Sequence, residues 1–300
     1  MFVVQFSVAK EFDKIPHLKP EDIETIRNWL KTQPHLPNQQ VTDLDIVLAY
    51  HCCEYNMELT KQVIDLNYTL RTMFSFYSNR DINKSLELAL HTWLITPLQT
   101  ATPEGYRAVY CQLLDDDPKK SVYSDLVRAF VMILDLWQYE EGTVPGIIII
   151  VNMDKVTLNH ITRIDLKVAQ EFFYFIQEAM FIRLKEFHFI NAPVFVDKML
   201  TMMKPIMKKE MLDLLKVHQV GSNTLEQYIH LETLPKDAGG HNENSQELRD
   251  KVWNKLKLNK KFFEEESKKR VVESKRPGQP KTISTIFPGL EESFKNLEID

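Results

Sequence analysis

The residues able to do chemistry in this sequence are few and stand apart from one another. His160, His188 and His218 are each isolated along the chain. The sequence has no GxSxG nucleophile motif, no GxxxxGK[ST] phosphate loop, no GxGxxG turn opening a helix and no HExxH metal pair. A lone histidine on an apolar strand is more often a hydrogen-bonded core residue than a catalyst. We therefore expect a protein that is not an enzyme.

Metal and cofactor sites are not expected either. The three cysteines are Cys52, Cys53 and Cys111, an odd number with two adjacent, which is no disulfide framework and suits a reducing compartment. His51 precedes the cysteine pair, but a tetrahedral metal site needs further ligands at metal-binding spacing. The pair Gly239-Gly240 lacks the lysine and helix start of a phosphate loop, so we expect a turn there.

Charge and hydropathy exclude several further classes of protein. The chain has 37 Lys and Arg against 42 Asp and Glu, so its net charge of −5 gives no broad electrostatic attraction to nucleic acid or to anionic membranes. The N-terminus does not read as a secretory signal, and the apolar run 147–151 is far shorter than the ~20 residues of a membrane span. We expect a cytoplasmic protein. We also expect a monomer, because no feature such as a heptad array requires a second chain.

The elements that must position any site alternate in type. Apolar β-rich runs predict strands at 106–113, 146–152, 185–191 and 214–218, and helical periodicity predicts helices at 123–139 and 165–180 between them. Such alternation implies a mainly parallel sheet covered by helices. The first hundred residues show no strand pattern and predict helices at 20–31, 43–50, 57–77 and 83–93. The fold class is therefore α/β behind an N-terminal helical cap.

A methionine-rich helical segment follows the strand at 185–191. Asp197, Thr201, Lys204 and Lys208 share one face of it and leave four methionines between Met199 and Met207, with their apolar neighbours, for the others. Such a stripe is more often core than ligand surface, but methionine also adapts well to an irregular apolar ligand.

The order of motifs around this helix resembles the CRAL-TRIO family of lipid-binding proteins. A strand ends in Asn191-Ala192-Pro193, the apolar helix contains Lys204-Pro205, and Leu234-Pro235 precedes Gly239-Gly240. Within the family, the chain is most similar to the branch of the alpha-tocopherol transfer protein and cellular retinaldehyde-binding protein. The resemblance implies a helical domain at 1–101 followed by a lipid-binding domain at 102–255. A charged extension follows at 256–300, and its apolar residues suggest that it docks back on the fold: Ile283, Ile286, Phe287, Leu290, Phe294 and Leu297. It also implies a mobile lid helix, at 194–211, over an apolar pocket. Pro205 removes one backbone donor and disfavours helix at Lys204, so we expect a kink between two lid segments there.

The function implied is an intracellular carrier that binds one small hydrophobic lipid, such as a tocopherol, retinoid, carotenoid or sterol, and contacts membranes transiently. Phospholipid exchange or phosphoinositide sensing, and a module that transports nothing, remain alternatives. The residues expected to contact the lipid are the apolar ones on the pocket helices, strands and lid: Leu126, Ala129, Phe130, Ile133, Ile147, Val151, Leu158, Ile164, Phe172, Phe175, Ile176, Phe187, Val196, Met199, Leu200, Met203, Ile206 and Met207.

Two departures from the family bear on the ligand and on membranes. Ala129 and Ile133 stand where the tocopherol carrier has hydroxyl residues, which predicts a more apolar lipid, or one anchored by other groups such as Thr157, Tyr174 or Gln177. Glu210 and Leu214 replace two basic residues of the family's phosphoinositide patch. The residues expected to contact phosphoinositide are therefore those that remain basic: Arg183, Lys185, Lys208, Lys209 and Lys216.

Overall fold

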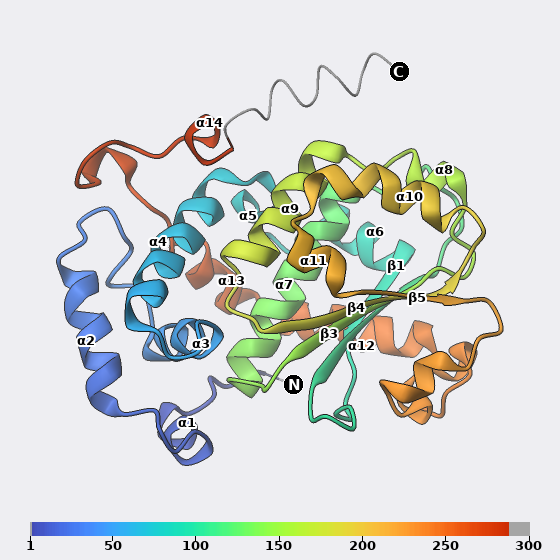
Figure 1. Cartoon of the computed structure of the whole chain (residues 1–300), viewed down its shortest axis with the longest axis horizontal. Helices are drawn as coiled ribbons and strands as arrows, with labels where there is room; N and C mark the ends of the chain where they lie inside the picture. Colours follow the sequence, from blue (N-terminus) through green and yellow to red (C-terminus); the bar gives the residue numbers. More distant parts are fainter. Residues whose placement is uncertain (1, 288–300) are drawn as a thin grey trace.

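The computed structural model describes residues 2–287, and its N-terminal part is helical (Figure 1). The helices are α1 (Val8–Lys14), α2 (Pro20–Lys31), α3 (Asp43–Cys52), α4 (Met57–Met73), α5 (Ser75–Ser78) and α6 (Lys84–Thr92). Local chemistry explains their starts: Pro20 opens α2, and Thr42 and Asp45 form a capping box before α3. The helix expected at 57–77 is interrupted because Phe74 is extended, at ψ 133°.

A five-stranded sheet follows, in the order β1 (Trp93–Pro97), β2 (Arg107–Leu113), β3 (Ile147–Asn152), β4 (Leu184–Ala192) and β5 (Leu215–Gln219). Strand β1 is antiparallel to β2, and the other neighbours are parallel. The mainly parallel sheet and four of its strands are thus confirmed. The prediction of an all-helical first hundred residues is wrong, because β1 begins directly after α6. A five-residue apolar run with no break before it cannot be told from a helix end by pattern.

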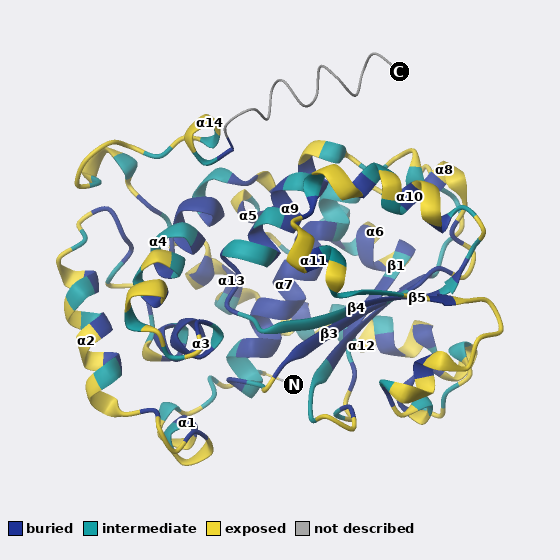
Figure 2. Cartoon of the chain, viewed as in Figure 1, coloured by how far each residue is buried: buried dark blue, intermediate teal, exposed yellow. Residues whose placement is uncertain are grey.

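The connections between the parallel strands place their helices on one face of the sheet. Helix α7 (Tyr123–Glu141) joins β2 to β3, and α8 (Leu158–Ile161) and α9 (Leu166–Glu178) join β3 to β4. Because each connection is expected to be right-handed and the strand order follows the sequence, α7 and α9 must lie on the same side. Strand β3 is buried between two layers, as its unalternating isoleucines predicted (Figure 2).

The segment between β4 and β5 consists of three short helices. These are α10 (Val196–Met203), the 3-10 turn η1 (Lys204–Ile206) and α11 (Lys209–Asp213). Pro205 lies within the 3-10 turn, and Met207 after it is extended, at ψ 139°. The predicted kink at Lys204-Pro205 is confirmed, and the stripe of Asp197, Thr201, Lys204 and Lys208 is exposed, as expected.

The opposite face of the sheet is covered by the chain after β5. The 3-10 turns η2 (Thr224–Gln227), η3 (Leu231–Thr233) and η4 (Lys236–Ala238) bring Leu225 and Leu234 against Ile148 and Ile150. Gly239 has φ +87°, and a Cβ at Gly240 would lie 2.0 Å from the Leu234 carbonyl oxygen, so the pair forms a closing turn as predicted. Helix α12 (Ser245–Leu258) then packs along β1 and covers this edge of the sheet (Figure 1).

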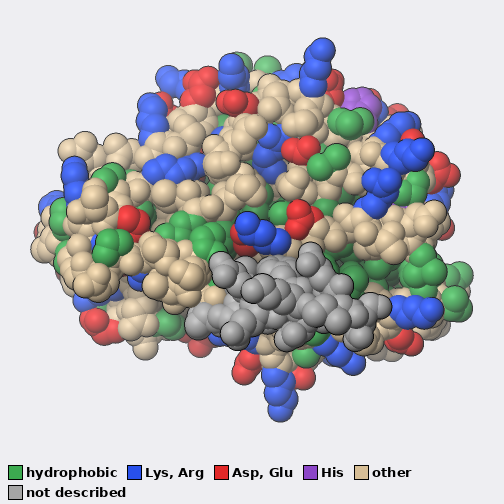
Figure 3. Space-filling view, turned by 90° about the horizontal axis from the view of Figure 1, so that it is seen from above, with side chains coloured by type: hydrophobic (Ala, Val, Ile, Leu, Met, Phe, Trp, Pro, Cys, Tyr) green, Lys and Arg blue, Asp and Glu red, His purple; other side chains and the backbone are tan. Residues whose placement is uncertain are grey.

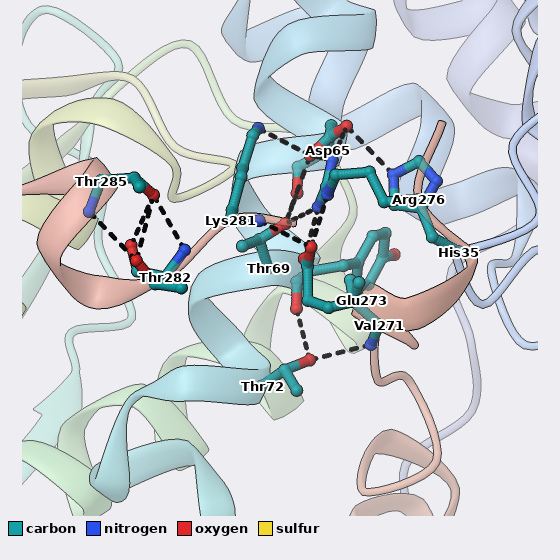
Figure 4. A network of polar contacts seen from close by, with 11 residues as sticks. His35, Asp65, Thr69, Thr72, Val271, Glu273, Arg276, Lys281, Thr282 and Thr285 are labelled. Atoms are coloured by element: carbon teal, nitrogen blue, oxygen red, sulfur yellow. Dashed lines mark hydrogen bonds and ion pairs between the residues drawn. The ribbon is translucent and has the colours of Figure 1, made fainter. Parts of the chain in front are cut away.

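The C-terminal segment returns to the N-terminal helices. After α13 (Lys260–Glu266), the chain crosses α4, where Arg276 donates to both oxygens of Asp65 at 2.8 and 2.7 Å and Lys281 donates to Asp65 at 2.9 Å (Figure 4). Beyond the turn η5 (Glu273–Lys275) and α14 (Ile283–Ile286), the Phe287 ring lies 4.4 Å from that of Tyr174, between centroids. Of the expected tail contacts, Leu290, Phe294 and Leu297 lie outside the described residues.

A buried ion network joins the three regions of the chain. Arg71 on α4 pairs with Asp135 on α7 at 2.9 Å and with Glu266 on α13 at 2.8 Å. Lys269 pairs with Asp45 at the start of α3 at 2.7 Å and also with Glu266. Asp45 is partly exposed, whereas the other four groups are almost wholly buried, so each of those four needs its partner to offset the cost of leaving water.

Candidate functional site

An apolar cavity of about 190 Å³ lies between the sheet, α7, the α8–α9 region and α10. The sheet contributes side chains of the same face from successive strands, among them Ile95, Cys111, Ile149 and Phe187. Helix α10 contributes Met199 and Met203 to the cavity wall. The sheet, α7, α9 and the first helix of the expected lid thus all contribute to the cavity wall, whereas residues 204–211 of the lid do not.

Part of the predicted lipid-contact set lies together around this cavity. The residues that line it come from α7, β3, the α8–α9 loop, α9, β4 and α10: Leu126, Phe130, Val151, Ile164, Phe172, Phe187, Met199 and Met203. These positions agree with a pocket between the sheet and the lid. Their contact with a lipid stays a prediction.

The other predicted contact residues do not line the cavity: Ala129, Ile133, Ile147, Leu158, Phe175, Ile176, Val196, Leu200, Ile206 and Met207. Ile133 faces a small separate pocket with Leu256 of α12, Phe175 packs against Phe76 and Tyr77, and Leu158 is 45% exposed. The cause is that α7 is buried on nearly all sides from Val127 to Gln138, so apolar periodicity does not tell cavity from core.

This placement changes the expectation about ligand polarity. Since neither Ala129 nor Ile133 lines the cavity, their lack of hydroxyl groups does not describe the surroundings of a bound molecule. Of the alternative anchors, Gln177 accepts from the Lys208 backbone N–H at 2.9 Å and Tyr174 packs on Phe287. Thr157 hydrogen-bonds His160, which does line the cavity.

The sequence interpretation missed several wall residues. They include Trp93 and Ile95 on the unpredicted strand β1, Ser121 and Tyr123 at the start of α7, and His160 in α8. A signal existed for Ser121, Tyr123 and His160, because they follow the carboxyl ends of β2 and β3. The carboxyl ends of parallel strands are where α/β sheets bind ligands.

The polar groups of the wall gather near that same end. Ser121 accepts a hydrogen bond from Trp93 Nε1 at 3.4 Å, and Asp116 and Asp117 of the loop after β2 act electrostatically on His160. Burial, aided by Arg163, lowers the pKa of His160 and outweighs the opposing effect of these two carboxylates. The ring is therefore neutral at pH 7.

The basic residues expected to contact phosphoinositide are dispersed. Arg183 donates from Nε to the His51 carbonyl at 2.8 Å, Lys185 lies over the Tyr106 ring, and Lys208 pairs with Glu178 at 2.5 Å. Lys216 pairs in register with His188, on the sheet face opposite to Phe187 and the cavity, and Lys209 is exposed on α11. Seen from above, Lys and Arg are scattered among acidic and apolar side chains (Figure 3).

His188 and His218 are not isolated in space. Nδ1 of His188 lies 2.9 Å from Nε2 of His218, and the outer nitrogens contact Glu186 at 2.9 Å and Thr224 at 2.7 Å. Burial, with the Lys216 charge nearby, lowers the pKa of His188 to about 4. The pair is a neutral hydrogen-bonded chain in the far-face core. Separate strands carry the two rings, so spacing along the sequence could not reveal it.

Within residues 2–287, no cluster of three or more His, Cys, Asp or Glu is arranged to hold a metal ion. No helix in that range is long and apolar enough to cross a bilayer.

The fold and the site define an α/β protein with a mainly parallel sheet and an apolar cavity beneath the methionine-bearing helix α10. Residues 92–240 match the model of the CRAL/TRIO domain, and residues 15–86 match the Pinta-like UBA domain. Residues 92–240 therefore belong to the CRAL-TRIO family of lipid-binding and lipid-transfer proteins.

Two known proteins and one solved structure are similar to this chain. The human "Alpha-tocopherol transfer protein-like" is 21% identical over 250 residues, covering 83% of this chain and 72% of the relative. Clavesin-1 of Xenopus laevis is 21% identical over 233 residues, covering 77% of this chain and 70% of that protein. The crystal structure of Sfh5 aligns with a TM-score of 0.47 at 10% identity, covering 76% of this chain and 89% of that one.

Proposed function

We propose that this protein is a carrier that binds one small hydrophobic lipid in the cavity between the sheet and α10 and transfers it between membranes. The observation that supports the proposal is a cavity walled by aromatic and aliphatic side chains and by Met199 and Met203 inside a CRAL/TRIO domain. Roughly 25 cal/mol is gained for each Å² of apolar surface removed from water, so burying a few hundred Å² of lipid gives several kcal/mol. That gain provides useful affinity before any polar contact is counted.

Release requires the wall formed by α10 to move. The segment from α10 to α11 is joined to α9 by the Lys208 backbone bond to Gln177 and by the Lys208–Glu178 ion pair. Pro205 removes one backbone donor within this segment, and the extended Met207 separates its two helices. We propose that α10 swings as a lid about residues 204–208 when the protein meets a membrane.

The test is to identify what the purified protein carries. Native mass spectrometry of the full chain, followed by analysis of an organic extract, should reveal one bound lipid per chain with a single hydrocarbon body. Recovery of a phospholipid with two acyl chains would favour phospholipid exchange instead. A chain that carries nothing and takes up no lipid from liposomes would contradict the carrier proposal and favour an interaction module.

A further inference from the structure

One buried histidine offers an unused hydrogen-bond donor to the cavity. His160 in α8 is 7% exposed and lines the cavity wall. Its Nδ1 lies 3.1 Å from the Thr157 backbone N–H and 2.9 Å from the Thr157 hydroxyl. Because a backbone N–H can only donate, Nδ1 accepts, and the neutral ring carries its hydrogen on Nε2.

The Nε2 atom of His160 has no hydrogen-bond partner among residues 2–287. A buried donor without a partner costs about 1 to 3 kcal/mol, and native proteins usually satisfy such groups with a partner, a water or a ligand. Thr157 fixes the ring from the other side, so this donor is held in place and cannot turn away. An acceptor atom brought by the ligand would remove the cost.

A cation lies at the same end of the cavity. Arg163, which is exposed, contributes to the wall just after α8, and in the described part of the chain its side chain forms no hydrogen bond or ion pair. Ser121 and Tyr123 add hydroxyl groups to this end, and no Asp or Glu belongs to the wall. Asp116 and Asp117 lie near enough to act on His160, but neither forms an ion pair with Arg163. The wall itself therefore supplies hydrogen-bond donors and one cation, and the two carboxylates lie outside it.

We infer that the carried lipid has a single carboxylate head group, which accepts from His160 Nε2 and pairs with Arg163 while its hydrocarbon tail lies between the sheet and α10. A carboxylate has acceptor atoms only, and a charged partner about doubles the strength of a hydrogen bond. A hydrocarbon would leave the His160 donor unpaired. This inference rests on the proposed carrier function and specifies its ligand class.

The test compares three probes of equal chain length: hexadecanoic acid, hexadecanol and hexadecane, delivered from cyclodextrin to the full, delipidated protein. The acid should bind about tenfold more tightly than either neutral probe, a difference of ~1.4 kcal/mol. His160→Phe and Arg163→Ala should each remove most of this preference, measured as the ratio of acid to hexadecane affinity within the same variant. Lys167→Ala, an exposed cation outside the cavity wall, is the matched control and should keep the preference.

Hexadecane binding also reports whether each variant folds with an intact cavity. Equal affinity of the wild-type protein for the three probes would overturn the head-group assignment while leaving the carrier function standing. So would an equal loss for all three probes in both variants. If none of the three probes binds and the extract holds no lipid, the carrier function itself fails. A stronger preference for hexadecanol would replace the carboxylate by a hydroxyl and overturn the inference.

Discussion

Glu171 on α9 is a buried acid without a partner among the residues described, at 4% exposure. Burial first, and Asp165 second, raise its pKa to about 7, although Lys167 opposes this. The unfolded chain releases this proton near pH 4.5, whereas the native state holds it until about pH 7. The free energy of unfolding therefore falls as the pH rises through this window, and ionised Glu171 destabilises the native state at alkaline pH.

Glu171→Gln should accordingly stabilise the protein at pH 8 by roughly 1 to 2 kcal/mol and have almost no effect at pH 4, since one pKa unit corresponds to about 1.4 kcal/mol and partial hydration reduces the full value. Urea unfolding at the two pH values measures the difference. Glu24→Gln, on the exposed side of α2, is the control and should be neutral at both. Equal effects of Glu171→Gln at pH 4 and pH 8 would contradict the raised pKa.

At the scale of elements, the lid segment carries a direct test of the cavity. Met203 is buried and lines the wall, whereas Thr201 on the same helix is exposed. Met203→Asp should lower lipid loading at least about tenfold, because an unpaired charge in apolar surroundings is costly. Thr201→Asp should load normally. Quantitative extraction of the two purified variants gives the comparison, and full loading of a folded Met203→Asp protein would exclude this cavity as the lipid site.

The dispersion of the basic residues predicts weak recognition of phosphoinositides. Arg183 is engaged by His51, Lys208 by Glu178, and Lys216 lies on the sheet face away from the cavity. Exposed charge pairs contribute about 0.2 to 1 kcal/mol each and are screened within ~8 Å at physiological salt.

In liposome flotation, bisphosphorylated phosphatidylinositol should therefore increase binding by less than about tenfold over phosphatidylcholine, consistent with contributions of this size. The double variant Arg183→Ala, Lys185→Ala should bind almost as the wild type does. Lys10→Ala, on exposed α1, is the control for a general loss of charge. Steep, salt-sensitive recruitment that this double variant abolishes would show that the basic residues act together.

At the scale of the whole molecule, the ion network makes the helical, sheet and C-terminal regions depend on one another. Arg71 touches both Asp135 and Glu266, so its removal leaves two buried carboxylates without this partner. Arg71→Met should lower the free energy of unfolding by about 3 to 5 kcal/mol and keep a single cooperative transition at a lower midpoint. Thermal and urea unfolding provide the measurement.

The matched control is Lys61→Met, because Lys61 pairs with the exposed Glu58 and such surface pairs contribute about 0 to 1 kcal/mol. Similar losses for Arg71→Met and Lys61→Met would contradict the role of the network. Two separate transitions in the wild-type protein would show that the regions unfold independently.

Features that depend on neighbours along the chain could be predicted from the amino-acid sequence. Apolar alternation and runs located β2 to β5, helical periodicity located α7 and α9, and Pro205 marked the break in the lid, because each depends on local backbone chemistry. Strand β1 and the interruption at Phe74 were not predicted, because a short apolar run is compatible with both a helix and a strand.

Packing between elements selects the apolar side chains that face the cavity and the polar groups that contact one another, and no local pattern encodes this packing. Helix α7 is buried on almost every side, so packing alone separates Phe130 in the wall from Ile133 beside α12. The pairing of His188 with His218 depends on the lateral register of β4 and β5, and the free Nε2 of His160 depends on a cap formed with Thr157 beside the cavity. Such contacts join residues through space, and the periodicity of one segment carries no information about its neighbour across a sheet.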